Sequence, residues 1–175
     1  GGGGGGGAGG TRGAAFSGGG GRGGTRGVAG GPSSRGRAGV DGRLVAGAKA
    51  AIGHTKTDFG VICGLRTIGE QRELVKEGAS KTMKSKHIEG RALDLLAYVG
   101  SRGSWELNLY DDLADAVKQG AIDVGVAVRW GAAWHINDIR EWDGTMEEAM
   151  NAYVDLRRSQ GKRPFIDGPH FELMD

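Results

Sequence analysis

Glycine is the residue that most restricts what the first quarter of this chain can fold into. Residues 1–42 are about half glycine, in a chain that has 37 glycines among 175 residues. Such a segment buries too little apolar surface to offset the entropy that ordering costs. We therefore expect a flexible, disordered tail over residues 1–42 and one folded domain over residues 43–175. The roughly 130 residues of that domain are enough to bury a sizeable core.

Hydrophobic periodicity predicts helices and strands in the second part of the chain. Helices are expected over residues 43–54, 69–78, 111–119 and 145–159, and strands over residues 59–65, 91–99, 124–130 and part of residues 165–174. Gly78 and Gly120 are expected to end the second and third helices. Helices combined with strands in a non-alternating order favour an α+β fold, in which helices pack mostly on one side of a small sheet.

The single cysteine and the lack of long apolar runs indicate in which cellular compartment the protein is made. Cys63 has no partner for an internal disulfide, and its place in the apolar run 59–65 favours a buried structural thiol over a nucleophile or a ligand. No apolar run approaches the ~20 residues of a membrane span, and the N-terminus lacks a signal-peptide pattern. We expect synthesis in the cytoplasm, with any export supplied by another system.

Two short segments each place a histidine close to a carboxylate. They are residues 85–94 (SKHIEGRALD) and residues 167–172 (DGPHFE). Imidazole nitrogen and carboxylate oxygen both suit zinc, and a catalytic zinc takes three protein ligands and leaves a fourth position for water. His87, Asp94 and His170 fill that number, so we predict one Zn²⁺ per chain.

The residues around Asp94 favour this choice. Gly90 lets the chain turn after His87, and residues 91–99 then read as a strand that projects Asp94 from the same face as the small Ala92. Taken singly, His87 could be a loop histidine and Asp94 a surface carboxylate. The complete pattern, with residues 167–172 added, favours the metal site.

The same residues resemble a known family. The pattern S-x-H-x-x-G-x-A-x-D, followed downstream by D-x-P-H-F-E, is similar to the zinc D,D-carboxypeptidase and L-alanyl-D-glutamate endopeptidase family. This family includes the VanY-type peptidases and many bacteriophage endolysins. The resemblance runs from about Arg43 to the C-terminus. It implies a hedgehog/D,D-peptidase-like fold, with a small, mainly antiparallel sheet and helices packed around it.

The resemblance also implies catalytic roles. In the family the acidic residue at the position of Asp167 is the general base, and an arginine at the position of Arg66 is held toward the substrate carbonyl or carboxylate. A guanidinium suits both tasks because it keeps its charge and offers a planar fork of donors; the alternative is an ordinary surface arginine. Glu172 is the second candidate for the base, although an acceptor that orients a metal ligand is the simpler role.

Four further residues are candidates for supporting or substrate-binding roles. Gln71 and Ser85 either support the site by hydrogen bonds or act as local caps. Trp130 and Trp134, in the run W-G-A-A-W, either wall the cleft or pack in the core. Related endolysins often have W-G-G-D-W, so Ala133 stands where an acidic residue is usual.

An extra segment follows this run. Residues 136–163 look like an insertion that carries a helix, which could shape specificity or dock a partner.

The function that the resemblance implies is hydrolysis of a peptidoglycan stem peptide by a phage endolysin. We favour the L-alanyl-D-glutamate endopeptidase over the D-alanyl-D-alanine carboxypeptidase because the short chain and residues 167–172 resemble the phage enzymes. The expected location is the host cytoplasm, with action on the cell wall after release, or the virion. A virion structural component that carries this domain is the alternative, although the complete ligand set counts against loss of activity.

The tail adds a basic arm to this domain. Through Arg43 the chain has six arginines and one aspartate, a net charge of +5, so the rest of the +2 chain is mildly acidic. Such an arm would be attracted to anionic envelope polymers, more weakly at high salt, or would be a solvated linker; docking to virion proteins is a further option. R-G-G occurs only around Arg22, with little aromatic interleaving, so we expect no specific nucleic-acid partner.

Overall fold

The computed structural model describes residues 39–175, and the predicted tail therefore lies almost wholly outside the described residues. The elements in chain order are α2 (Gly42–Ala51), β1 (Asp58–Cys63), α3 (Ile68–Lys76), β2 (Ala92–Val99), β3 (Arg102–Ser104), α4 (Leu107–Val124), β4 (Val128–Trp130), the short 3-10 helix η1 (Ile139–Glu141), α5 (Met146–Ser159) and β5 (His170–Leu173). Among residues 39–175 no helix is both long enough and apolar enough to cross a membrane.

The strands form one antiparallel sheet, so the predicted α+β class is confirmed. The order is β1-β2-β5-β4, and β3 pairs with β2 beyond the end of β5. Residues 92–94 of β2 pair with β5, whereas residues 97–99 pair with β3. The long strand β2 is thus the shared partner of β1, β3 and β5, and its register sets what meets across the sheet.

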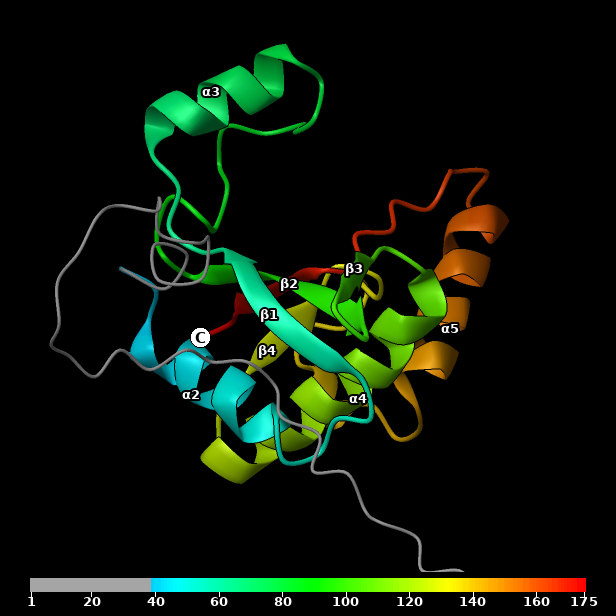
Figure 1. Cartoon of the computed structure of the whole chain (residues 1–175). Coiled ribbons are helices and arrows are strands. Elements are labelled where there is room, and N and C mark those ends of the chain that lie inside the picture. The colour runs from blue at the N-terminus through cyan, green and yellow to red at the C-terminus, as the bar shows by residue number, and fades with distance from the viewer. Residues whose placement is uncertain (1–38) are drawn as a thin grey trace, which may run out of the picture.

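The two faces of the sheet differ in character. Leu93, Leu95 and Ala97 of β2 are buried on one face, and α2 and α4 cover that side in Figure 1. Asp94, Leu96 and Tyr98 point to the other face and are only half-buried. The core therefore lies between the sheet and helices α2 and α4. The opposite face, which we call the open face, is not covered by these two helices (Figure 1).

Residues 64–86 form an excursion above the open face (Figure 1). Within it, α3 begins with a capping box in which Thr67 and Glu70 each bond the other's backbone N–H. Gln71 is the one buried residue of α3. Because this helix buries so little, polar contacts rather than an apolar core hold the excursion in place.

The helix after β3 is longer than the predicted residues 111–119, because Gly120 does not end it. Gly120 lies in the middle of the α2–α4 contact, and α4 continues to Val124 before Gly125 ends it with a φ of 68°. The predicted strand over residues 124–130 is therefore shortened to Val128–Trp130. The expected turn at residues 100–104 contains the short strand β3.

Replacing Gly120 with alanine should destabilise the domain. A Cβ at Gly120 would lie 2.5 Å from the Gly47 carbonyl oxygen and 2.6 Å from the Ala51 backbone nitrogen. Overpacking against backbone atoms should lower the free energy of unfolding by about 1–3 kcal/mol. Urea denaturation followed by circular dichroism measures this change.

Gly47→Ala in the facing helix is the matched control. A Cβ there meets only the Val124 side chain, at an ordinary 3.8 Å. Because alanine favours a helix, this variant should be neutral or more stable by up to about 1 kcal/mol. Equal stability of the two variants would contradict the close approach of α2 and α4.

Candidate active site

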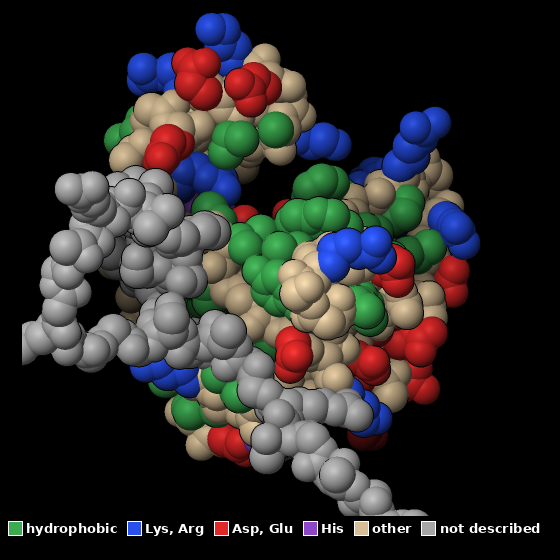
Figure 2. All heavy atoms as spheres, viewed as in Figure 1, with side chains coloured by type: hydrophobic (Ala, Val, Ile, Leu, Met, Phe, Trp, Pro, Cys, Tyr) green, Lys and Arg blue, Asp and Glu red, His purple; other side chains and the backbone are tan. Residues whose placement is uncertain are grey.

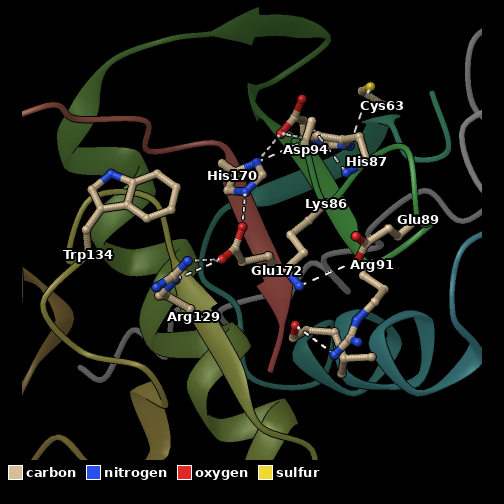
Figure 3. A network of polar contacts seen from close by, with 12 residues as sticks. Cys63, Lys86, His87, Glu89, Arg91, Asp94, Arg129, Trp134, His170 and Glu172 are labelled. Atoms are coloured by element: carbon tan, nitrogen blue, oxygen red, sulfur yellow. Dashed lines mark hydrogen bonds and ion pairs between the residues drawn. The ribbon is translucent and has the colours of Figure 1, made fainter. Parts of the chain in front are cut away.

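Three atoms that could each bind a metal ion converge on the open face of the sheet (Figure 3). The His87 Nε2 and the His170 Nδ1 each lie 3.1 Å from the Asp94 Oδ1, and these two nitrogens lie 3.2 Å apart. Ligand atoms bound to tetrahedral zinc at about 2.1 Å are separated by roughly 3.4 Å. The donor set and its spacing therefore fit one small cation such as Zn²⁺.

The fold brings these residues together in two ways. The β2–β5 register places Asp94 directly opposite His170. His87 comes from the turn after the excursion, where Gly90 has a φ of 67° and the His87 carbonyl accepts from the Arg66 backbone N–H at 2.9 Å. The turn expected at Gly90 is therefore present.

A carbonyl oxygen fixes the orientation of the His87 ring. The Nδ1 of His87 lies 2.8 Å from the Gly64 carbonyl oxygen, which can only accept. Nδ1 therefore carries a proton and donates, and Nε2 is left to face Asp94 and His170. His87 is also almost fully buried, so its ring has little freedom to turn.

A carboxylate orients the His170 ring in the same manner. The Glu172 Oε2 lies 3.1 Å from the His170 Nε2 and accepts its proton, which leaves Nδ1 to face Asp94. Arg129, opposite Glu172 in the β4–β5 register, donates to Glu172 from its Nε at 2.8 Å and from an Nη. Glu172 thus lies on the far edge of the ring from the convergent donors, which favours an orienting role over that of the base.

The shared carboxylate changes the pKa of both histidines. Burial alone would lower the pKa of His87, but its hydrogen bonds with Asp94 and Cys63 raise it to about 10. Burial also opposes the bonds with Asp94 and Glu172 that raise the pKa of His170 to about 9. Burial likewise opposes the histidine contacts that hold the pKa of Asp94 below its usual range. The cluster therefore attracts positive charge, as protons or as a metal ion.

Asp167 lies beside this cluster. Burial raises the pKa of its carboxyl group above the usual value, while the charges of His170 and His87 lower it and that of Asp94 raises it further. The backbone holds the residue in place, because its N–H donates to the Gly131 carbonyl at 2.9 Å and its carbonyl accepts from the His170 N–H at 3.1 Å. Asp167 thus lies near the three convergent atoms without being one of them.

Arg66 also reaches the cluster. One Nη lies 3.8 Å from the Asp94 Oδ2, and the guanidinium donates to the Gln71 Oε1 at 2.7 Å. The Gln71 amide donates in turn to the Ser80 Oγ at 2.8 Å and the Thr82 carbonyl at 2.6 Å. Gln71 therefore ties Arg66 to the loop after α3.

Ser85 has a more local role. Its Oγ accepts from the His87 backbone N–H at 3.3 Å, so it caps the turn that carries His87.

Cys63 lies at the edge of the site, which corrects the expectation of a buried thiol. It is half-buried, and its Sγ lies 3.9 Å from the His87 Nδ1 and 3.4 Å from an Arg66 Nη. A β-bulge between Val61 and Cys63 brings the residue opposite Asp94. Cys63, His87 and Asp94 each offer a potential ligand atom within 4.8 Å of the others. The thiol, however, faces the Nδ1 edge of His87, away from the His170 ring.

The two tryptophans have different roles. Trp130 is fully buried, stacks on Phe171 and donates from its Nε1 to the Gly168 carbonyl at 2.7 Å, so it is a core residue beneath the site. The Trp134 ring lies 5.6 Å from the His170 ring and stacks on Phe165. Only Trp134 of the two borders the site (Figure 3).

Neighbouring positions support the same wall of the site. Ala133 is fully buried. The segment 136–163 contributes Tyr153 of α5, whose hydroxyl accepts from the Phe165 backbone N–H at 3.3 Å. Residues 136–163 thus support the loop that leads to Asp167.

Residues that sequence reasoning missed also lie here. Arg129 holds Glu172 and packs over the Trp134 ring at 5.3 Å, and the Lys81 ammonium lies 5.3 Å from the Phe165 ring centroid. No sequence pattern marks them, because each depends on a neighbour distant in the chain.

Comparisons with known proteins point to one family of peptidases. Residues 30–174 match the family model of the phage L-alanyl-D-glutamate peptidases. The chain is 28% identical over 146 residues to the L-alanyl-D-glutamate peptidase of Escherichia phage T5, which covers 81% of this chain and 94% of that protein. It also resembles the crystal structure of the Serratia marcescens L-Ala D-Glu endopeptidase ChiX, with a TM-score of 0.60 and 31% identity over 82% of this chain and 86% of that one.

The family model spans nearly all of the described residues, including the whole site. The resemblance inferred from the two motifs is therefore confirmed, as is the expectation of a peptidase. This chain belongs to the phage L-alanyl-D-glutamate peptidase family.

Proposed function

We propose that this peptidase hydrolyses the L-alanyl-D-glutamate bond of the peptidoglycan stem peptide with one zinc ion per chain, held by His87, Asp94 and His170. The observation that carries the proposal is the convergence of these three donor atoms to within 3.2 Å of one another. Family membership supports both the reaction and the substrate. When bound, zinc supplies Lewis acidity and lowers the pKa of water.

Asp167 is the proposed general base. A carboxylate whose pKa is raised by burial holds a proton more readily than an exposed one, which suits a group that takes a proton from water and gives it to the leaving amine. Its backbone bonds to Gly131 and His170 keep it beside the ligands.

Arg66 is the proposed electrostatic partner of the substrate. Gln71 and Asp94 hold its guanidinium at the edge of the site. From there it donates to the substrate's carbonyl or carboxylate and stabilises negative charge that develops during hydrolysis.

The D-alanyl-D-alanine carboxypeptidase is the weaker candidate. The family model and both relatives are named for the L-alanyl-D-glutamate bond. We propose the endolysin role accordingly, with action on the host wall after release from the cytoplasm or from a virion. Binding of the basic tail to anionic envelope polymers or to virion proteins stays a prediction, since that segment lies outside the described residues.

Digestion of purified peptidoglycan tests this function. The zinc-loaded protein should release fragments with a new N-terminal D-glutamate, detected by mass spectrometry. Asp167→Asn should lower kcat by about 10²–10⁴-fold, because it removes the base, and its zinc content should equal that of the wild type. Chelation should abolish activity, and added zinc should restore it.

Asp143→Asn, at an exposed loop aspartate, is the matched control and should keep full activity. Release of free D-alanine would instead assign the carboxypeptidase reaction. If protein with one bound zinc releases no product, the lytic function is wrong and a structural role in the virion is favoured.

Zinc affinity should rise with pH. The raised pKa values of His87 and His170 keep both imidazoles protonated near neutral pH without metal, so zinc must displace protons. The apparent Kd should fall by about tenfold per pH unit for each proton released, measured by chelator competition between pH 6 and pH 8. Calorimetry in buffers of different ionisation enthalpy counts the protons.

The control is His54→Gln. His54 pairs with Asp123 and is not among the convergent donors, so this variant should keep the wild-type pH dependence. An affinity independent of pH would contradict binding to these two histidines.

A further inference from the structure

The open face of the sheet continues past Asp94 as a flat apolar surface. Leu96 and Tyr98 follow Asp94 on the same face of β2 and are half-buried. A Cβ at Gly60 would lie 3.3 Å from the Tyr98 ring, and one at Gly103 would lie 2.8 Å from the Leu96 Cδ2. The two side chains thus lie over glycines of the flanking strands β1 and β3, and the surface stays flat.

Trp105 extends this surface. It follows β3 directly, and Ser104, the residue before it, pairs with Ala97, which is next to Leu96 in β2. One face of its ring stacks on the buried Tyr110, while 65% of the residue is exposed. Figure 2 shows hydrophobic side chains gathered in this region, across the hollow from α3. We define Leu96, Tyr98 and Trp105 as the aromatic platform.

The platform is continuous with the proposed catalytic groups. A Cβ at Gly168, the residue after Asp167, would lie 3.1 Å from the Tyr110 Cβ and 3.3 Å from Leu107. The loop that carries the base therefore packs on the same helix start that supports the Trp105 ring. A substrate bound at Asp94 and Asp167 would extend onto the platform.

The charged groups around the site indicate which end of the substrate lies at which end of the site. Arg66 lies at the Cys63 end of the site, opposite to the uncharged platform. In the stem peptide, D-glutamate keeps a free α-carboxylate next to the scissile bond, whereas L-alanine is joined through a lactyl group to an amino sugar of the glycan strand. The D-glutamate carboxylate would therefore bind near Arg66, and the amino sugar would lie on the platform.

We propose that the aromatic platform is a subsite for this amino sugar, with Trp105 as the residue that selects peptide still attached to glycan. The sugar begins roughly 7 Å from the scissile carbonyl, since one residue and a lactyl group intervene. Leu96 lies about 7 Å beyond Asp94 along the strand. The negative face of an indole also attracts the C–H groups of a pyranose ring. This inference rests on the proposed function.

Two soluble substrates with the same scissile bond test the subsite. One is a disaccharide-linked stem peptide, and the other is that peptide without sugar, its L-alanine capped by a lactyl group. The wild type should have the higher kcat/KM on the sugar-linked substrate. Trp105→Ala should reduce the ratio of the two kcat/KM values by about fivefold to tenfold, mostly through KM. Trp105→Tyr should keep most of the preference.

Ile122→Ala is the matched control, because Ile122 is 46% exposed in the last turn of α4. It should leave the ratio unchanged, and thermal unfolding should show that all three variants are folded. Equal losses on both substrates in Trp105→Ala would assign the ring a structural role through Tyr110 and overturn the subsite. A wild type without preference for sugar would also overturn it.

Other outcomes separate this inference from the function on which it rests. If the wild type cleaves neither substrate, the proposed function fails. If Trp105→Ala digests whole peptidoglycan poorly but keeps the wild-type ratio, the platform binds another partner and the sugar subsite is wrong.

Discussion

The pairing of β2 with β5 is the constraint on which the site depends. It sets Asp94 directly opposite His170 in an antiparallel register, and the carboxylate then meets two imidazole nitrogens at 3.1 Å. A shift of one residue would turn Asp94 to the helical face, because side chains alternate along a strand. The burial of Leu93 and Leu95 on that face opposes such a shift. The hydrophobic core therefore enforces the geometry of a polar cluster on the other side of the same strand.

The histidines owe their orientation to partners outside the convergent set. The Gly64 carbonyl accepts from His87, and Glu172 accepts from His170 while Arg129 holds Glu172. Each partner fixes which ring nitrogen carries a proton and leaves the other directed at Asp94. These partners come from β4, β5 and the residue after β1, so the strands on both sides of β2 take part in building the cluster.

Polar and apolar side chains occupy different parts of the open face along β2. Polar groups gather around Asp94, under an excursion tied down by the buried Gln71, and apolar side chains follow toward β3. Helices α2 and α4 stabilise the domain from the opposite side, with Gly120 allowing their close approach. This separation lets the residues above the sheet serve binding and chemistry, because the packing that holds the fold lies below it.

The sequence by itself determined the ligand candidates, the family and most elements. These depend on short-range patterns: the spacing from His87 to Asp94, the alternation of residues 91–99 and the capping box at Thr145. It misplaced the end of α4, because Gly120 is a local helix-ending signal that the packing of α2 overrides. Only the tertiary structure decided that Cys63 reaches the site, that Trp130 is a core residue while Trp134 borders the cluster, and that Arg129 holds Glu172. The physical reason is that each of these roles depends on a contact between segments far apart in the chain, which sheet register and helix packing create and local sequence patterns do not encode.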